Sequence, residues 1–243
     1  MFNFFKRTNA ITDISWLGAD IHSHILSGID DGATELTQSL RYVKGLHELG
    51  YSRLIGTPHI LKELYPNDRS TIEAKFKDLT REITNAQIPV RMDYAAEYMI
   101  DEGFDLNSDL CLIDEKYILI EMSYLNESPD IDKVIFELQV KGFQPILAHP
   151  ERYIYYFKDP SRLKKFKLMG CMMQLNLLSV LNYYGKDVKK MSEYLLGEKI
   201  YDFAGTDLHH DRHFSLLNKS ITEGSLYKLL GHYPFKNREA FVF

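Results

Sequence analysis

Short apolar runs alternate with helix-like patterns along this chain, and that alternation constrains the fold more than any other feature. After the first run, Leu36, Leu40 and Val43 recur at helical spacing, as Ile72 and Phe76 do after the second. Helical crossovers between successive strands imply that the strands lie parallel. The sequence therefore predicts an α/β fold with seven parallel strands, over residues 17–22, 53–57, 89–96, 117–122, 144–148, 171–176 and 200–205.

A helix between the fourth and fifth of these runs is marked at both ends. Ser128-Pro129 predicts its start, because proline suits a first helical turn, and Lys141-Gly142 predicts its end. No linker rich in proline, glycine or serine interrupts the series. With 243 residues, 45% of them hydrophobic, the chain is expected to form one domain over residues 1–243.

Charge and composition narrow the expected surroundings. The net charge of −5 gives no long-range attraction to nucleic acid or to an anionic membrane, so neither is expected as a partner. No run of 18 apolar residues occurs and residues 1–10 lack the features of a secretory signal, so a cytoplasmic protein is expected. Cys111 and Cys171 are predicted to be buried in strands. The apolar start, residues 1–5, fits either a partner contact or closure of a barrel, and the oligomeric state stays open.

Most histidines and several carboxylates stand at or just past the C-terminal end of a predicted strand. In a closed βα barrel these ends share one face, where active sites are built. An open sheet would spread the same residues along a line. The pattern therefore favours a closed, TIM-like βα barrel that gathers His22, His24, His59, Glu97, Glu121, His149, Asp207 and His209.

The residue types in this set are those of a metal centre. Side chains two positions apart in a strand point to the same side, so His22 with His24, and Asp207 with His209, can each offer two ligands to one cavity. Imidazoles and carboxylates suit divalent Mn, Fe, Co or Zn. Burying so many ionisable groups would be costly without a partner or a metal, so we expect them to bind metal.

Three other kinds of phosphate chemistry lack their motifs. A cysteine phosphatase needs arginine six residues after the nucleophile, and Tyr117 and Leu177 occupy those positions after Cys111 and Cys171. The string 130–134 resembles an aspartate-nucleophile motif but follows no apolar strand, so it fits the acidic first turn of a helix better. No glycine-rich loop at Walker spacing precedes a helix.

Five motifs in order carry a resemblance over nearly the whole chain. They are Asp20-Ile21-His22-Ser23-His24, Gly28-Ile29-Asp30-Asp31-Gly32, Thr57-Pro58-His59, Ala148-His149-Pro150-Glu151-Arg152 and Gly205-Thr206-Asp207-Leu208-His209. With them the chain resembles the polymerase-and-histidinol-phosphatase (PHP) superfamily. Within it, the chain looks most like the bacterial manganese-dependent protein tyrosine phosphatases that accompany the tyrosine kinases of capsule and exopolysaccharide synthesis.

The resemblance implies a distorted seven-stranded PHP-type barrel with three divalent metal ions, Mn²⁺ first, with Fe, Co or Zn as alternatives. Asp31 is chosen over Asp30 because it directly precedes Gly32 in the matching motif. The implied ligand sets are His22, His24, Glu97 and Asp207 for one ion, Glu97, Glu121 and His149 for a second, and Asp31, His59 and His209 for a third.

The resemblance also implies two arginines that bind the phosphate. Arg152 matches the family arginine three residues after the histidine, and Arg212 is the candidate for the second, although its spacing departs from the family's. Asp20 is expected to orient a ligand imidazole.

The implied activity is hydrolysis of phosphotyrosine on a protein, the partner being a bacterial tyrosine kinase. A small-molecule phosphomonoesterase of the histidinol-phosphatase type, and a metal-dependent binding module without activity, remain alternatives. The aromatic residues of 153–157 either line a slot for a phenyl ring or pack on the barrel, and the sequence leaves both open.

Overall fold

A computed structural model describes residues 11–242, which contain nine strands in two wholly parallel sheets. The apolar start, residues 1–5, lies outside the described residues. The first sheet has the order β1 (Ala19–Asp20), β2 (Arg53–Gly56), β4 (Arg91–Tyr94). The second has the order β3 (His59–Ile60), β5 (Glu97–Met99), β6 (Tyr117–Glu121), β7 (Gln144–Ala148), β8 (Met172–Asn176), β9 (Phe203–Gly205). The predicted parallel α/β fold is confirmed.

The prediction of seven strands in one closed barrel is not confirmed in that form, because two of the predicted strands, 53–57 and 89–96, are each followed directly by a further short strand, β3 and β5. Pro58 separates β2 from β3, since proline has no N–H to donate to the ladder. Ala95 and Ala96 separate β4 from β5. At each of these two breaks, from β2 to β3 and from β4 to β5, the chain passes from the first sheet to the second.

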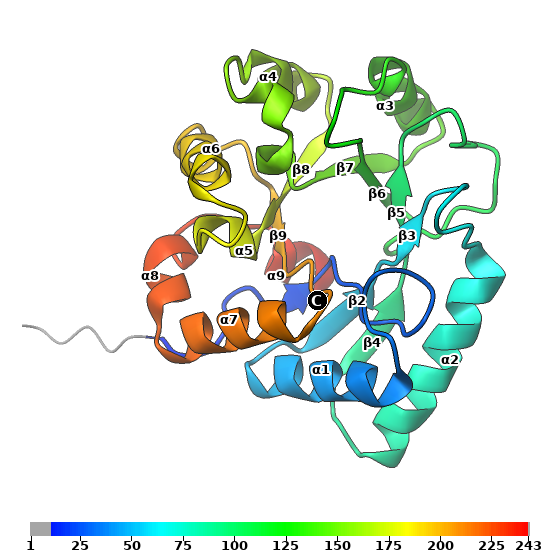
Figure 1. Ribbon diagram of the computed structural model, residues 1–243, viewed down its shortest axis with the longest axis vertical. Helices are drawn as coiled ribbons and strands as arrows, with labels where there is room; N and C mark the ends of the chain where they lie inside the picture. The colour runs from blue at the N-terminus through cyan, green and yellow to red at the C-terminus, as the bar shows by residue number, and fades with distance from the viewer. Residues whose placement is uncertain (1–10, 243) are drawn as a thin grey trace, which may run out of the picture.

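The segments that contain the first and the last strand lie side by side. The His24 amide donates to the carbonyl of Leu208 at 3.0 Å, and the Asp207 amide donates to that of His22 at 2.8 Å. The Asn237 side-chain amide donates to main-chain oxygens of both β1 and β9. The first and last strand segments are therefore joined, and helices surround the strands in the view of Figure 1.

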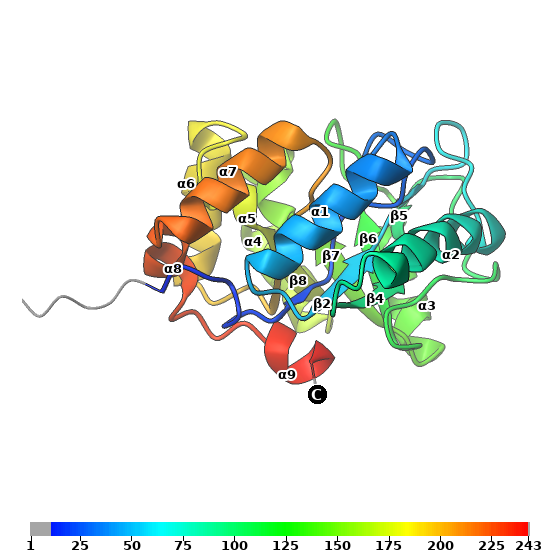
Figure 2. The same ribbon diagram turned by 90° about the horizontal axis from the view of Figure 1, so that it is seen from below.

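Helices lie outside the strands and alternate with most of the predicted ones (Figures 1 and 2), but within residues 11–242 no helix lies between β5 and β6, where the predicted alternation is wrong. No helix within residues 11–242 is both long and apolar enough to cross a membrane. The α-helices are α1 (Leu36–Glu48), α2 (Arg69–Asn85), α3 (Ile131–Val140), α4 (Ser161–Leu168), α5 (Leu177–Val180), α6 (Lys186–Gly197), α7 (Asp211–Thr222), α8 (Ser225–Leu230) and α9 (Asn237–Phe241), with 3₁₀ turns η1 (Pro150–Arg152) and η2 (Ile154–Tyr156).

Local signals explain the helix boundaries. The Asp68 carboxylate accepts from the amide of Thr71 at 2.8 Å, and the Thr71 hydroxyl oxygen accepts from the amide of Asp68 at 2.9 Å, which forms a capping box for α2. Helix α3 begins at Ile131, slightly later than Ser128-Pro129 predicts. It ends before Gly142, whose φ of +86° favours glycine.

Helix α9 covers the N-terminal ends of the strands (Figure 2). Its Phe241 ring packs edge-on against Tyr117, the first residue of β6, with centroids 5.2 Å apart, and lies 5.1 Å from Phe203, the first residue of β9. This apolar contact covers the N-terminal ends of β6 and β9. The predicted metal ligands lie at the opposite end of the strands.

Both cysteines are buried, as predicted, and both are free. Neither lies in a strand, so that part of the prediction is wrong. Cys171 directly precedes β8, and Cys111 lies in the loop before β6.

Candidate metal centre

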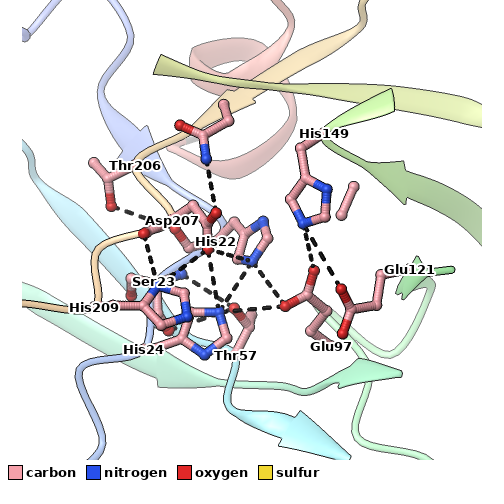
Figure 3. A network of polar contacts seen from close by, with 12 residues as sticks. His22, Ser23, His24, Thr57, Glu97, Glu121, His149, Thr206, Asp207 and His209 are labelled. Carbon is pink, nitrogen blue, oxygen red and sulfur yellow. Dashed lines mark hydrogen bonds and ion pairs between the residues drawn. The ribbon is translucent and has the colours of Figure 1, made fainter. Parts of the chain in front are cut away.

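The polar residues that the sequence singled out converge at the C-terminal ends of the strands (Figure 3). They come from seven separate segments of the chain, and all of the nine predicted metal ligands except Asp31, His59 and His209 are almost fully buried. His22 and His24 follow β1, Asp31 lies in the loop before α1, His59 follows the end of β2 and begins β3, Glu97 follows the end of β4 and begins β5, Glu121 ends β6, His149 follows β7, and Asp207 and His209 follow β9.

Two imidazoles and two carboxylates form the innermost group. The Nε2 atoms of His22 and His24 lie 3.2 Å apart. Glu97 Oε2 lies 3.1 Å from the first nitrogen and 3.3 Å from the second. Asp207 Oδ1 lies 3.3 Å from both. Four potential ligand atoms thus share one small, buried volume.

The hydrogen bonds on the far side of each ring fix its tautomer. His22 Nδ1 lies 2.9 Å from Gln174 Oε1, and the amide nitrogen of Gln174 donates to the carbonyl of Leu175 at 2.6 Å, which sets the orientation of that amide. His24 Nδ1 lies 2.8 Å from a carboxylate oxygen of Asp30. Both Nδ1 atoms must therefore donate, so both neutral rings present a lone pair at Nε2.

Lone pairs therefore face lone pairs in the innermost group. Glu97 Oε2 is buried and has no hydrogen-bond partner within residues 11–242. Burial alone would lower the pKa of His22, but the carboxylates of Glu97 and Asp207 raise it, so a proton is one way to relieve the clash. A divalent cation is the other, and this donor set fits one.

A second set adjoins the first through Glu97. His149 Nε2 lies 3.0 Å from Glu97 Oε1 and 3.9 Å from Glu121 Oε2. His59 Nδ1 lies 2.9 Å from Glu121 Oε1 and 3.2 Å from Glu97 Oε2. Glu97 therefore reaches both groups with its two oxygens, as a bridging ligand would.

A third set lies nearer the surface. Asp31 Oδ1 is 3.5 Å from the Nε2 atoms of both His59 and His209, and a ligand atom of His24 lies close to all three. His209 Nδ1 lies 2.9 Å from the main-chain oxygen of Asp207, which leaves its Nε2 free to bind. The structure thus brings together all nine predicted metal ligands.

The neighbouring Asp30 has a different environment from Asp31. Its carboxylate lies against His24 Nδ1 and also accepts from the main-chain amides of His59 and Gly32. Asp30 therefore orients His24 through its Nδ1 atom. Asp31, the residue preferred as a ligand in the sequence analysis, is the one whose carboxylate faces His59 and His209.

The two predicted phosphate-binding arginines differ in position. Arg152 lines the cavity over the histidines, and its Nη1 donates to Asp207 Oδ2 at 2.8 Å. Arg212 is exposed on the first turn of α7 and is not among the residues that line this cavity. The structure therefore does not bring Arg212 to the site, and its role stays a prediction.

The cavity has a volume of about 350 Å³ and mixes polar and apolar walls. Its rings come from Tyr65, Tyr124 and Tyr184 rather than from residues 153–157. Within that stretch Tyr153 and Tyr156 are buried, and Tyr155 donates to the carbonyl of Ser123. Packing, the second of the two interpretations of this cluster, is the one that the structure supports.

Asp20 does not orient an imidazole, which corrects that expectation. Its carboxylate accepts from the hydroxyl of Thr206 at 2.6 Å and from the amide of Thr206 at 2.9 Å. Burial raises the pKa of Asp20 to about 6, despite these bonds. The residue joins the first and last strand segments instead.

Sequence reasoning missed Gln174 and Asn176 of β8. Gln174 holds His22, and the Asn176 side chain donates to Asp207 Oδ2 at 2.7 Å. A signal was available, because two polar residues at alternate positions of an otherwise apolar strand share one face, the same spacing that marked His22 and His24.

Known proteins resemble this chain in sequence and in structure. The model of the family described as "Capsular polysaccharide synthesis, CpsB/CapC" matches residues 18–219. Tyrosine-protein phosphatase YwqE of Bacillus subtilis (strain 168) is 29% identical over 195 residues, which cover 79% of this chain and 77% of YwqE. Tyrosine-protein phosphatase CpsB of Streptococcus agalactiae is 29% identical over 200 residues, which cover 79% of this chain and 82% of CpsB.

Solved structures agree. A chain from the crystal structures of YwqE from Bacillus subtilis and CpsB from Streptococcus pneumoniae, described as unique metal-dependent tyrosine phosphatases, superposes with a TM-score of 0.79 at 26% identity and covers 91% of this chain and 90% of that one. The lactonase Lmo2620 from Listeria monocytogenes shares the fold alone, with a TM-score of 0.52 at 11% identity, covering 93% of this chain and 91% of that one. The resemblance drawn from the motifs is thereby confirmed: the chain belongs to the CpsB/CapC family of capsular polysaccharide synthesis.

Proposed function

We propose that this protein is a metal-dependent tyrosine phosphatase that hydrolyses phosphotyrosine on a protein. The observation that carries the proposal is the innermost group, where the lone pairs of His22 and His24 face the carboxylates of Glu97 and Asp207. Such a group fits a divalent cation, and a multi-metal site beside an arginine suits a phosphate monoester. The family supports the same activity, since its relatives are named tyrosine-protein phosphatases.

Three divalent ions, most simply Mn²⁺, are the proposed cofactor, held by the three ligand sets described above. When bound, such ions supply Lewis acidity for water and for the phosphoryl group. The nearness of all three sets supports this number, because Glu97 adjoins both the first and the second, and Asp31 reaches both histidines of the third. We also propose that the strands close as a distorted barrel of the PHP type, for which the bonds between the first and last strand segments are the support.

The protein's own side chains then bind and orient the substrate. Arg152 is the group that neutralises the phosphoryl oxygens, because it lines the cavity beside the metal ligands. The walls formed by Leu61, Tyr65 and Tyr124 suit the phenyl ring of the substrate. A phenol, with a pKa of about 10, leaves more readily than an alcohol, so the site needs no strong general acid.

The proposed substrate is a tyrosine kinase that controls capsule or exopolysaccharide synthesis. We propose that the reaction takes place in the cytoplasm. The family description supports the pathway, and the two free, buried cysteines suit a reducing compartment.

Phosphate release tests the proposal. Metal-stripped protein, with Mn²⁺ added back, would be given a phosphotyrosine peptide, a phosphoserine peptide and histidinol phosphate, with the variant His22→Ala as control. We expect metal-dependent release from phosphotyrosine that His22→Ala abolishes. A preference for histidinol phosphate would indicate a small-molecule phosphatase, and metal binding without turnover would indicate a binding module.

A further inference from the structure

Arg152 contacts two aromatic rings from different parts of the chain. Its guanidinium carbon lies 4.7 Å from the ring centre of Tyr124 and 4.1 Å from that of Tyr184. Tyr124 lies in the loop after β6, and Tyr184 lies between α5 and α6. We infer that Tyr124 and Tyr184 are positioning residues, which hold the Arg152 guanidinium in the orientation that binds phosphate.

The hydrogen bonds of Arg152 leave most of its donors for a ligand. A guanidinium carries five N–H donors. Within the part of the chain that the structure describes, one hydrogen bond of the Arg152 side chain is made, from Nη1 to Asp207 Oδ2. The side chain is only 18% exposed and lines the cavity. Its position is thus set mainly by ring contacts and one carboxylate, while the other N–H groups stay available.

One amide ties the ring and the carboxylate together. The Asn176 side-chain nitrogen donates to Asp207 Oδ2 at 2.7 Å and to the hydroxyl oxygen of Tyr184 at 3.1 Å. Tyr184 is therefore fixed relative to the same oxygen that accepts from Arg152. Arginine loses substantial rotational freedom when it binds an anion, so a guanidinium already held by its surroundings binds phosphate at a lower entropic cost.

The inference rests on the proposed function, because it assumes that Arg152 receives the phosphoryl group. It predicts that Tyr124→Leu and Tyr184→Leu each lower kcat/KM for a phosphotyrosine peptide by about tenfold, the size expected of a partly buried cation–π contact. They should weaken competitive inhibition by inorganic phosphate by a similar factor. Tyr124→Phe and Tyr184→Phe keep the ring and should restore most of both.

Three controls separate positioning from a structural role. Tyr194→Leu removes another tyrosine that contacts a cation, Lys164, outside the cavity and should leave activity unchanged. In an Arg152→Ala background, Tyr184→Leu should cost little more, because the group that it positions is gone. Thermal unfolding and metal content of each variant would be measured alongside, and both should match those of the parent protein.

The outcomes distinguish this inference from the proposed function. Leucine variants with unchanged phosphate inhibition would overturn the inference, as would an equal loss in the Arg152→Ala background. If the parent protein fails to release phosphate from phosphotyrosine, the proposed substrate is wrong. The affinity of the Mn²⁺-loaded protein for inorganic phosphate, measured by calorimetry, then still decides whether the two rings support Arg152.

Discussion

Two clusters of charged residues lie at opposite ends of the strands, one around the buried Arg53 with the partly exposed Asp93 and Asp114, the other at the candidate metal centre, and their hydrogen bonding differs. At the N-terminal end, Arg53 donates from Nε to Asp93 at 2.7 Å, from Nη1 to Asp114 at 2.8 Å and to the carbonyl of Phe241 at 3.0 Å, and from Nη2 to Asp114 at 2.5 Å. Every nitrogen of this buried guanidinium has an acceptor. The cluster is electrically complementary and needs nothing from outside.

At the C-terminal end the opposite holds. His22 and His24 present lone pairs to carboxylate oxygens, and Arg152 makes one hydrogen bond within residues 11–242 where Arg53 makes four. Buried polar groups are normally satisfied, so a group of acceptors without donors marks a place built for a cation. The contrast teaches that the balance of donors and acceptors, rather than burial or charge alone, separates a functional cluster from a structural one.

The largest expected effect is at Glu97. Glu97→Gln removes the charge that adjoins two ligand sets while keeping the shape of the side chain. Loss of a supporting residue around a metal costs about 10- to 100-fold, so loss of a shared ligand should cost at least about 100-fold in activity. Bound metal, measured by mass spectrometry, should fall as well. Full metal content in an active Glu97→Gln protein would contradict the assignment.

At the other end, Arg53→Ala should harm stability instead of catalysis. It leaves Asp93 and Asp114 with only the more exposed Arg91, which should destabilise the protein by about 3 kcal/mol. For a chain of this size that corresponds to a fall in Tm of roughly 6–12 °C. The metal content and kcat of the folded variant should match those of the parent. Arg91→Ala, at a more exposed arginine near the same carboxylates, is the matched control with a small effect.

Variants of Gln174 test how far metal binding depends on the hydrogen bond that orients His22. Gln174→Leu removes the acceptor at His22 Nδ1, so the ring loses the bond that fixes its tautomer. We expect metal affinity to fall by about 10- to 100-fold, measured by titration with Mn²⁺. Gln174→Glu keeps an acceptor at this position and should retain the affinity better. Equal losses in both variants would show that the tautomer does not matter.

The N-terminal cluster also predicts a pH dependence. Hydrogen bonds from Arg53 lower the pKa of Asp114 below its unfolded value of about 3.9. A carboxyl group whose folded pKa is lowered stabilises the protein fully above its unfolded pKa and loses that effect as the pH falls through the folded value. Urea unfolding of the parent between about pH 5 and pH 3 should therefore show a steeper loss of stability than Arg53→Ala. Parallel curves would contradict this origin.

The smallest effect is expected at Arg212. Because it is exposed and does not line the cavity, Arg212→Ala should lower kcat/KM by no more than about threefold, and the loss should shrink with added salt. Arg152→Ala should lower it far more. If Arg212→Ala lowered kcat/KM as much as Arg152→Ala does, Arg212 would bind the phosphate, as the resemblance implied.

Local spacing predicted most of the fold and the ligands, because strand ends are marked by abrupt changes from apolar to polar residues. His22 with His24, and Asp207 with His209, were found in this way. The break at Pro58 was also visible, but that it moves the chain between two sheets depends on pairing with distant strands. Tyr124 and Tyr184 could not be predicted for a related reason: they reach Arg152 from two separate loops, and no local pattern encodes that meeting.

Anomalous diffraction at the manganese edge, from crystals of metal-stripped protein soaked in Mn²⁺, tests the central claim most directly. The predicted result is three peaks at the C-terminal ends of the strands, one of them among the facing atoms of His22, His24, Glu97 and Asp207. Crystals in which these four side chains are ordered but carry no peak would contradict the claim that this cluster is a metal centre.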